Sequence, residues 1–172
     1  MALTVEDGTG LSTADSYLSQ ANADTYIANH GNSTDWSGAT SDQKDEALRL
    51  ATQWLDLTYG QRWKGIRSNS DQALDWPRSG VSDRDGRAID TDELPQKLLD
   101  ATAEMALRHI TETDGIMPDE ADAAPVKQEK IKVGEIEESV TYAAPKPQAK
   151  RFTIVTRLIA DLIELGTELR RA

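Results

Sequence analysis

Trp76-Pro77-Arg78-Ser79-Gly80-Val81 stands inside a stretch, Gln61 to Glu93, that lacks the three-and-four spacing of apolar residues typical of helices. Pro77 cannot occupy a helix interior, because it has no N–H and its ring clashes with the preceding turn. Further along, Asp85-Gly86 favours a tight turn. We therefore predict a long ordered loop with a short hairpin around Asp85-Gly86, and we expect Trp63 and Trp76 to hold this loop against the core.

Three predicted helices flank the loop, and each has a recognisable start or stop signal. The first runs from about Ser19 to His30, and the loop after it is anchored by Trp36. The second runs from a cap at Thr40 or Ser41 to Gly60, with Gln43 where a capping-box partner of Thr40 would be. The third begins at Pro95 and ends near residues 113–115. Their predicted inner faces are Ala23, Tyr26 and Ile27; Ala47, Leu48, Ala51, Trp54, Leu55 and Thr58; and Leu98, Ala101, Thr102, Met105, Ala106 and His109.

The C-terminal third is divided by two linkers that contain prolines, Met117 to Pro125 and Ala143 to Ala149. Between them, Val126 to Tyr142 has strand-like character interrupted by Gly134, which predicts a two-stranded hairpin. A last helix is predicted from about Thr153 to Arg170, with a broad apolar face.

These elements predict a mainly α fold, a small bundle of about four helices with a protruding β-hairpin and long ordered loops. We expect a helical core domain over residues 1–125, a β-hairpin extension over 126–142, and a linker with the C-terminal helix over 143–172. An isolated hairpin is only marginally stable in water. We therefore expect the hairpin and the last helix to be contact elements rather than parts of the core.

Composition argues against several functional classes. The formal net charge is -11 and the pI is near 4.6, which is the wrong overall field for binding phosphates. The chain has no Cys, so it can form neither a disulfide nor a thiolate metal site. No stretch approaches the ~20 apolar residues of a membrane span, and residues 1–10 do not resemble a signal peptide.

A search for catalytic motifs favours a protein that is not an enzyme and needs no cofactor or metal. The only histidines, His30 and His109, have no partner at metal-ligand spacing, and no H-E-x-x-H motif, nucleophile elbow or phosphate-binding loop occurs. The segment from Asp83 to Ile89 is similar to a calcium loop, but the first ligand position would fall on Val81 and the bidentate Glu position on Asp92. A hairpin turn is the better interpretation of this segment.

One arrangement does favour nucleic acid. Basic and aromatic residues alternate in Gln61 to Arg67 and again in Trp76 to Arg78, and single strands bind by stacking bases on aromatic rings in a positive groove. The alternative is that Trp54, Trp63 and Trp76 are core anchors while the arginines bind backbone carbonyls. We favour this alternative, because a small core with a single Phe needs its tryptophans inside.

The same residues carry a resemblance to a family. Trp76 to Val81, followed by Asp83 to Arg87 and then Leu94-Pro95, resembles a block found in the small head–tail connector (adaptor) proteins of tailed bacteriophages. Four further segments are similar to parts of that family and extend the resemblance over nearly the whole chain: Ala14 to Tyr26, Ala47 to Thr52, Trp63 to Gly65 and Lys132 to Ile136. The family is also labelled as DnaT-like single-stranded-DNA-binding protein.

The resemblance implies a subunit of a ring of twelve copies in the virion neck, made in the host bacterial cytoplasm. Such a ring would join the portal to a stopper or tail-completion protein, and double-stranded DNA would pass through it without tight binding. An acidic channel wall is compatible with this role, because it would repel the duplex. Single-stranded-DNA binding of replication type is the alternative function.

We expect the partner-binding residues to lie in the hairpin and the C-terminal segment rather than in the helical core. No membrane partner is expected. The candidates are Val133, Glu135, Ile136, Tyr142, Arg157, Leu169, Arg170 and Arg171.

Overall fold

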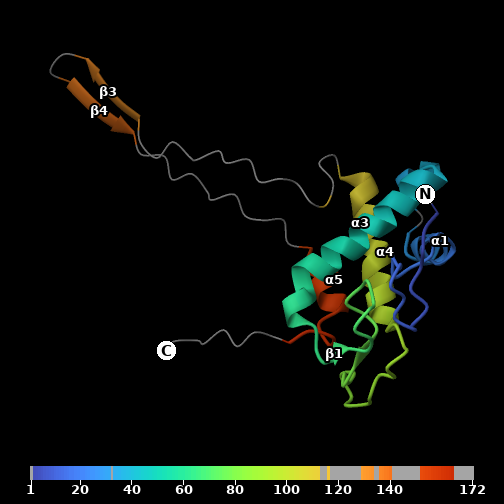
Figure 1. The fold of residues 1–172 in the computed structure, drawn as a ribbon. Coiled ribbons are helices and arrows are strands. Elements are labelled where there is room, and N and C mark those ends of the chain that lie inside the picture. The colour runs from blue at the N-terminus through green and yellow to red at the C-terminus, as the bar shows by residue number, and fades with distance from the viewer. Residues whose placement is uncertain are drawn as a thin grey trace. The chain divides into compact units, whose positions relative to one another are not determined.

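The computed structural model describes residues 2–31, 33–112, 116, 129–133, 136–140 and 152–164 (Figure 1). The chain divides into two compact units. The helical unit comprises Met1–Met117 and Thr153–Ala172, and the hairpin unit comprises Pro118–Phe152. The fold is mainly helical with a small antiparallel hairpin, as predicted. None of the described helices is both long enough and apolar enough to cross a membrane.

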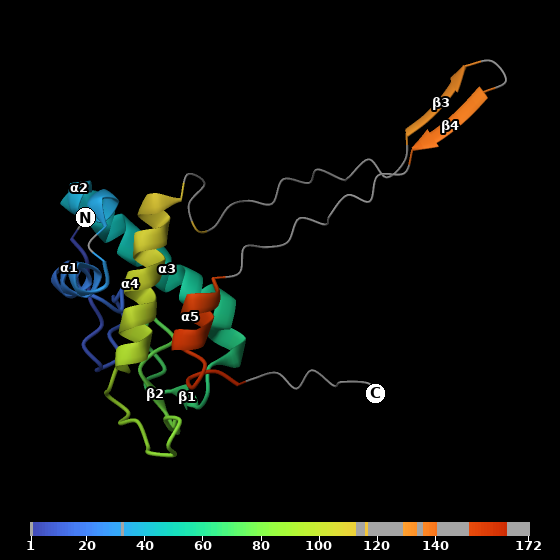
Figure 2. The same cartoon turned by 180° about the vertical axis from the view of Figure 1, so that it is seen from behind.

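Two helices form the centre of the helical unit. Helix α3 (Ser41–Tyr59) packs along α4 (Gln96–Thr111), and the buried side chains of both helices meet between them. The shorter helices α1 (Gln20–Asn29), α2 (Thr34–Gly38) and α5 (Thr153–Leu158) pack around α4 (Figures 1 and 2). The core of the unit therefore lies on the α3–α4 pair.

The predicted start of α3 is confirmed in detail. The backbone N–H of Gln43 donates to Thr40 Oγ1 at 3.3 Å, and the N–H of Thr40 donates to Gln43 Oε1 at 2.8 Å. This reciprocal capping box satisfies two backbone donors that a helix start would otherwise leave free. Gly60 caps the C-terminal end of α3, and a 3₁₀ turn, η1 (Gly60–Arg62), follows it.

Two local predictions for the helical unit need correction. The segment predicted as a loop around Trp36 contains the short helix α2, because Ser33 Oγ caps it by accepting the N–H of Trp36. On α3, Thr58 is exposed rather than buried, and Tyr59 is buried instead. The Tyr59 ring lies 5.8 Å from that of Trp63, and its hydroxyl is 2.8 Å from Thr156 Oγ1, which draws the end of the helix onto α5.

The segment between α3 and α4 is an ordered loop, as predicted. Two-residue strands β1 (Ile66–Arg67) and β2 (Arg78–Ser79) pair in antiparallel fashion. Ser82 and Ala88 form a further antiparallel bridge around the turn at Asp85-Gly86, where Gly86 has a φ of +80°. The carboxylate of Asp83 accepts the N–H groups of Asp85 and Arg87, so it orders the turn.

The C-terminal segment departs most from prediction. Helix α5 ends at Leu158 rather than near Arg170, and the chain continues through a turn to an antiparallel bridge between Ile163 and Trp63. Four apolar residues of this segment are fully or almost fully buried: Val155, Ile159, Leu162 and Ile163. The prediction that the last helix is a contact element outside the core was therefore wrong for these residues. The backbone bonds from Lys64 N–H to Leu162 and from Glu164 N–H to Arg62 replace further helix formation.

The hairpin unit contains the predicted hairpin. Strand β3 (Glu129–Val133) pairs antiparallel with β4 (Ile136–Val140), and Val133 stands opposite Ile136 at the end next to Gly134 and Glu135. No third strand joins this pair among the residues that the structure describes.

Candidate assembly interface

The Trp-Pro-Arg block belongs to the core of the helical unit. Trp76 is fully buried and Trp63 is 4% exposed, with their rings edge to face at a centroid distance of 5.9 Å. Tyr59 extends the cluster, and Trp54 contacts Tyr59 from the other side. A base can stack only on a ring whose face is accessible. The interpretation of Trp63 and Trp76 as core anchors is therefore confirmed.

Arg78 binds backbone carbonyls, as the same interpretation predicts. Its Nε donates to the carbonyl of Lys64 and its Nη2 to that of Gly65, each at 2.8 Å, while Nη1 donates to Asp75 at 3.1 Å. Gly65 has a φ of +70°, and a Cβ there would lie 2.2 Å from the carbonyl oxygen of Ser79. The close approach of these two loop strands therefore requires glycine at position 65.

The remaining basic residues of the proposed DNA site do not form a free positive groove. Lys64 Nζ donates to the carbonyl of Asp161 at 2.6 Å, and Arg67 donates to the carbonyl of Gln72. Arg62 is exposed, with its guanidinium 5.7 Å from the centre of the Tyr59 ring. Arg67 and Arg78 therefore hold the backbone of the loop itself, and Lys64 holds the C-terminal segment against it.

Tyr17 joins the N-terminal loop to α3 and to the Trp-Pro-Arg block. Its buried hydroxyl donates to Asp56 Oδ1 at 2.5 Å and accepts the N–H groups of Asp75 at 3.1 Å and Trp76 at 3.2 Å. Burial raises the pKa of Asp56 to about 7, and the charge of Asp75 adds to this shift, against the opposing hydrogen bond from Tyr17. A proton is therefore held at Asp56 under nearly neutral conditions.

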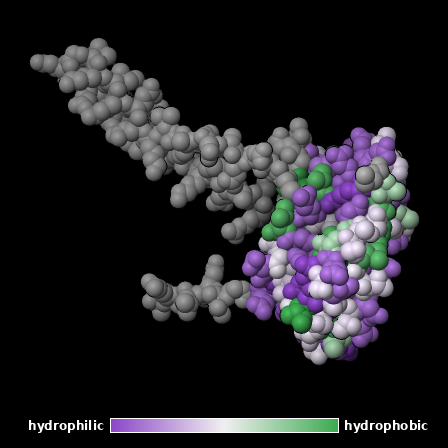
Figure 3. Space-filling model, in the orientation of Figure 1, coloured by the Kyte–Doolittle hydropathy of each residue, from purple (hydrophilic) through white to green (hydrophobic). Residues whose placement is uncertain are grey.

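A groove of about 380 Å³ runs beside this cluster, between α3 and the chain at positions 73–75. Leu57 lines it and is 72% exposed. We call it the α3 groove, and its lining is Asp15, Arg49, Thr52, Gln53, Asp56, Leu57, Ala73, Leu74 and Asp75. The face of the molecule drawn in Figure 3 is mostly hydrophilic, with separate hydrophobic spots rather than one continuous patch.

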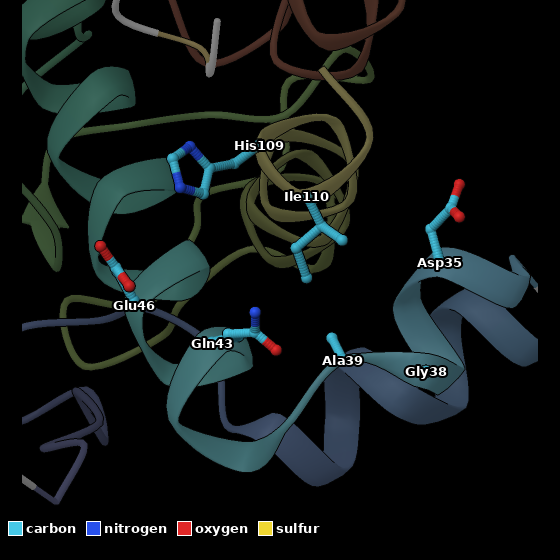
Figure 4. A pocket seen from close by; sticks show the side chains of 7 residues that line it. All are labelled: Asp35, Gly38, Ala39, Gln43, Glu46, His109 and Ile110. Atoms are coloured by element: carbon cyan, nitrogen blue, oxygen red, sulfur yellow. The ribbon is translucent and has the colours of Figure 1, made fainter. Parts of the chain in front are cut away.

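A second hollow of about 430 Å³ lies where α2, α3 and α4 meet (Figure 4). Asp35 comes from α2, Gln43 and Glu46 from α3, and His109 and Ile110 from α4. His109 is half-buried, and its Nδ1 is buried without a hydrogen-bond partner in the described structure. The lining contains no hydroxyl or thiol that could act as a nucleophile. No group of three or more potential metal-ligating side chains occurs among the described residues.

The hairpin register separates polar from apolar residues. Directly opposed residues lie on the same face of an antiparallel pair, and successive residues of a strand alternate between faces. The register places Ile131, Val133, Ile136 and Val140 on one face, with Glu129 and Glu138. The other face carries Lys130, Lys132, Glu137 and Ser139. The register therefore places the four aliphatic residues on one face of the two-stranded sheet, together with two glutamates.

A family model described as "Putative DnaT-like ssDNA binding protein" matches residues 1–172. The chain belongs to this family. No curated protein and no solved structure matches it.

The structure brings together only some of the predicted partner-binding residues. Val133 and Ile136 are directly opposed in the hairpin, and Arg157 is exposed on α5 in the other unit. Glu135, Tyr142, Leu169, Arg170 and Arg171 lie outside the described residues. Sequence reasoning missed the α3 groove, although one signal was present, because Leu57 is a large apolar residue off the apolar stripe of its helix.

The raised pKa of Asp56 predicts a pH-dependent stability. The folded-state pKa of about 7 exceeds the ordinary value of 3.8, so the stability that this proton contributes is fully present below pH 3.8 and is lost as pH rises to 7. Asp56→Asn removes the charge. The unfolding free energy of the variant minus that of wild type should therefore increase by roughly 2–4 kcal/mol as pH rises from 4 to 8.

Urea unfolding at several pH values measures this difference. Asp90→Asn, which removes an exposed carboxylate, is the matched control and should show little pH-dependent gain. A pH-independent difference between Asp56→Asn and wild type would show that Asp56 is ionised in the folded protein throughout.

Proposed function

We propose that this chain is a non-enzymatic structural subunit of a phage neck, an adaptor that assembles into a ring of twelve copies. The ring would bind the portal on one side and a stopper or tail-completion protein on the other, and it would extend the channel for double-stranded DNA. The protein would be made in the host cytoplasm and reside in the virion. The observation that carries the proposal is the register of the β3–β4 hairpin, which places its four aliphatic residues on one face, in a compact unit of its own.

The hairpin supports assembly for an energetic reason. A two-stranded sheet with no further partner is marginally stable, and apolar surface left in water costs about 25 cal/mol per Å². Contact with another protein would bury the face that carries Val133 and Ile136 and would stabilise the hairpin. The resemblance of the Trp-Pro-Arg block and four other segments to phage adaptor proteins points to the same kind of function.

The charge of the helical unit supports a channel that does not grip DNA. Residues 1–117 and 153–172, which make up this unit, carry twenty-three acidic and thirteen basic side chains, and a ring multiplies this excess. Tight DNA binding needs Lys and Arg that neutralise phosphates and release counterions. A negatively charged wall repels the negatively charged duplex and leaves it free to move.

Assembly can be tested with two charge substitutions in the hairpin. In light scattering, the wild type alone should form an oligomer with a mass several times 18.9 kDa, or should add mass in multiples of 18.9 kDa to its portal. Val133→Asp combined with Ile136→Asp should abolish this species, because it places charge on the apolar face, while the melting temperature of the helical unit stays unchanged.

Lys132→Gln combined with Glu137→Gln alters the opposite face of the same hairpin and is the matched control, expected to assemble normally. The proposal would be contradicted by a wild type that remains monomeric with the portal, or by normal assembly of the Val133→Asp/Ile136→Asp variant.

Single-stranded-DNA binding is the second candidate, and the description of the family favours it. The structure supplies few free groups for such a site, since Trp63, Trp76 and Arg78 are buried. We expect the free protein to bind a labelled oligonucleotide weakly in fluorescence anisotropy, and the signal to vanish with modest salt. Micromolar binding at physiological salt that Arg62→Glu removes would favour the second candidate instead.

A further inference from the structure

The α3 groove contains an apolar side chain that the fold leaves in contact with water. Leu57 is 72% exposed, whereas Leu48 and Leu55 on the same helix are fully buried. Leu74 and Ala73 line the groove beside it. A hollow with an exposed Leu at its side suits an apolar side chain from another segment.

The same groove contains uncompensated negative charge. Asp56 and Asp75 both line it, and neither forms an ion pair with another described residue. The third carboxylate, that of Asp15, is already 2.8 Å from Arg49 Nε. The raised pKa of Asp56 leaves it partly protonated near pH 7, but Asp15 and Asp75 still outnumber Arg49, the one Lys or Arg in the lining, and this excess favours a positively charged occupant.

The groove therefore needs an occupant that combines an apolar side chain with positive charge. The apolar face of the hairpin does not meet this need, because it also carries Glu129 and Glu138. The eight residues that follow Glu164 do meet it, since Leu169 is followed by two arginines, which outnumber the one carboxylate of the segment, Glu168. An extended segment of eight residues reaches up to about 26 Å, which is long enough to cross onto a neighbouring subunit.

We propose that the α3 groove binds the Leu169-Arg170-Arg171 segment of a second copy of this chain. Leu169 would pack on Leu57, and the arginines that follow it would meet the carboxylate of Asp75. A ring needs a heterologous contact, in which two different surface patches of each subunit pair with those of its neighbours. The groove and the C-terminal segment form such a pair, so the inference rests on the proposed ring function and identifies one of its contacts.

Complementation between two variants of the full chain tests the contact. Leu57→Glu inactivates the groove, and Arg170→Glu combined with Arg171→Glu inactivates the segment. Each variant alone should associate at least roughly tenfold more weakly than wild type. An equimolar mixture should form one-to-one pairs in native mass spectrometry. The Leu57→Glu chain keeps an intact segment, and the Arg170→Glu/Arg171→Glu chain keeps an intact groove to bind it.

Ile66→Glu is the matched control, since Ile66 is also 72% exposed but does not line the groove. Melting curves check that every variant is folded. Asp75→Lys is a second groove variant, and the Arg170→Glu/Arg171→Glu segment should restore its binding because the charges of groove and segment are exchanged. Failure of the mixture to pair would overturn the inference, as would normal assembly of Leu57→Glu. A monomeric wild type, alone and with the portal, would instead overturn the ring itself, so the two failures are distinguishable.

Discussion

The structure depends on the buried contacts around Trp76. The hydroxyl of Tyr17 accepts the N–H groups of Asp75 and Trp76 and donates to Asp56, so one oxygen joins the N-terminal loop, the central loop and α3. The guanidinium of Arg78 completes the arrangement by donating to three backbone carbonyls of the loop. Because these polar groups are buried, each would be costly to leave unpaired, and the long loop is therefore held in one conformation without extensive secondary structure.

This use of the Trp-Pro-Arg block changes the functional interpretation of the sequence. Alternating cations and aromatic rings are typical of single-strand binding surfaces, but here the rings pack on one another and Arg78 is nearly fully buried. The groups left available for partners lie elsewhere, in the aliphatic face of the hairpin and in the acidic α3 groove beside Leu57. Both surfaces suit protein partners better than phosphates, which supports the proposed role as an assembly subunit.

Much of the fold could be predicted because its signals are local. The Thr40 capping box, the glycine at the end of α3, the Asp85-Gly86 turn and the β3–β4 hairpin each follow from a few neighbouring residues. The end of α5 could not be predicted in this way, because Leu162 and Ile163 pair with the distant backbone of residues 62–64. The α3 groove could not be predicted for the same reason, since Asp56 and Asp75 come together only through tertiary packing. Its one signal in the sequence was Leu57, a large apolar residue off the apolar stripe of its helix.

The central claim is that the Trp-Pro-Arg block holds the core together and is not a DNA-binding surface. The unfolding free energy of Trp76→Ala in urea tests it most directly. Truncation of a fully buried aromatic side chain should lower the unfolding free energy by about 3–5 kcal/mol relative to wild type. A variant as stable as wild type would contradict the claim, because it would show that Trp76 contributes little to the core and is available for another purpose.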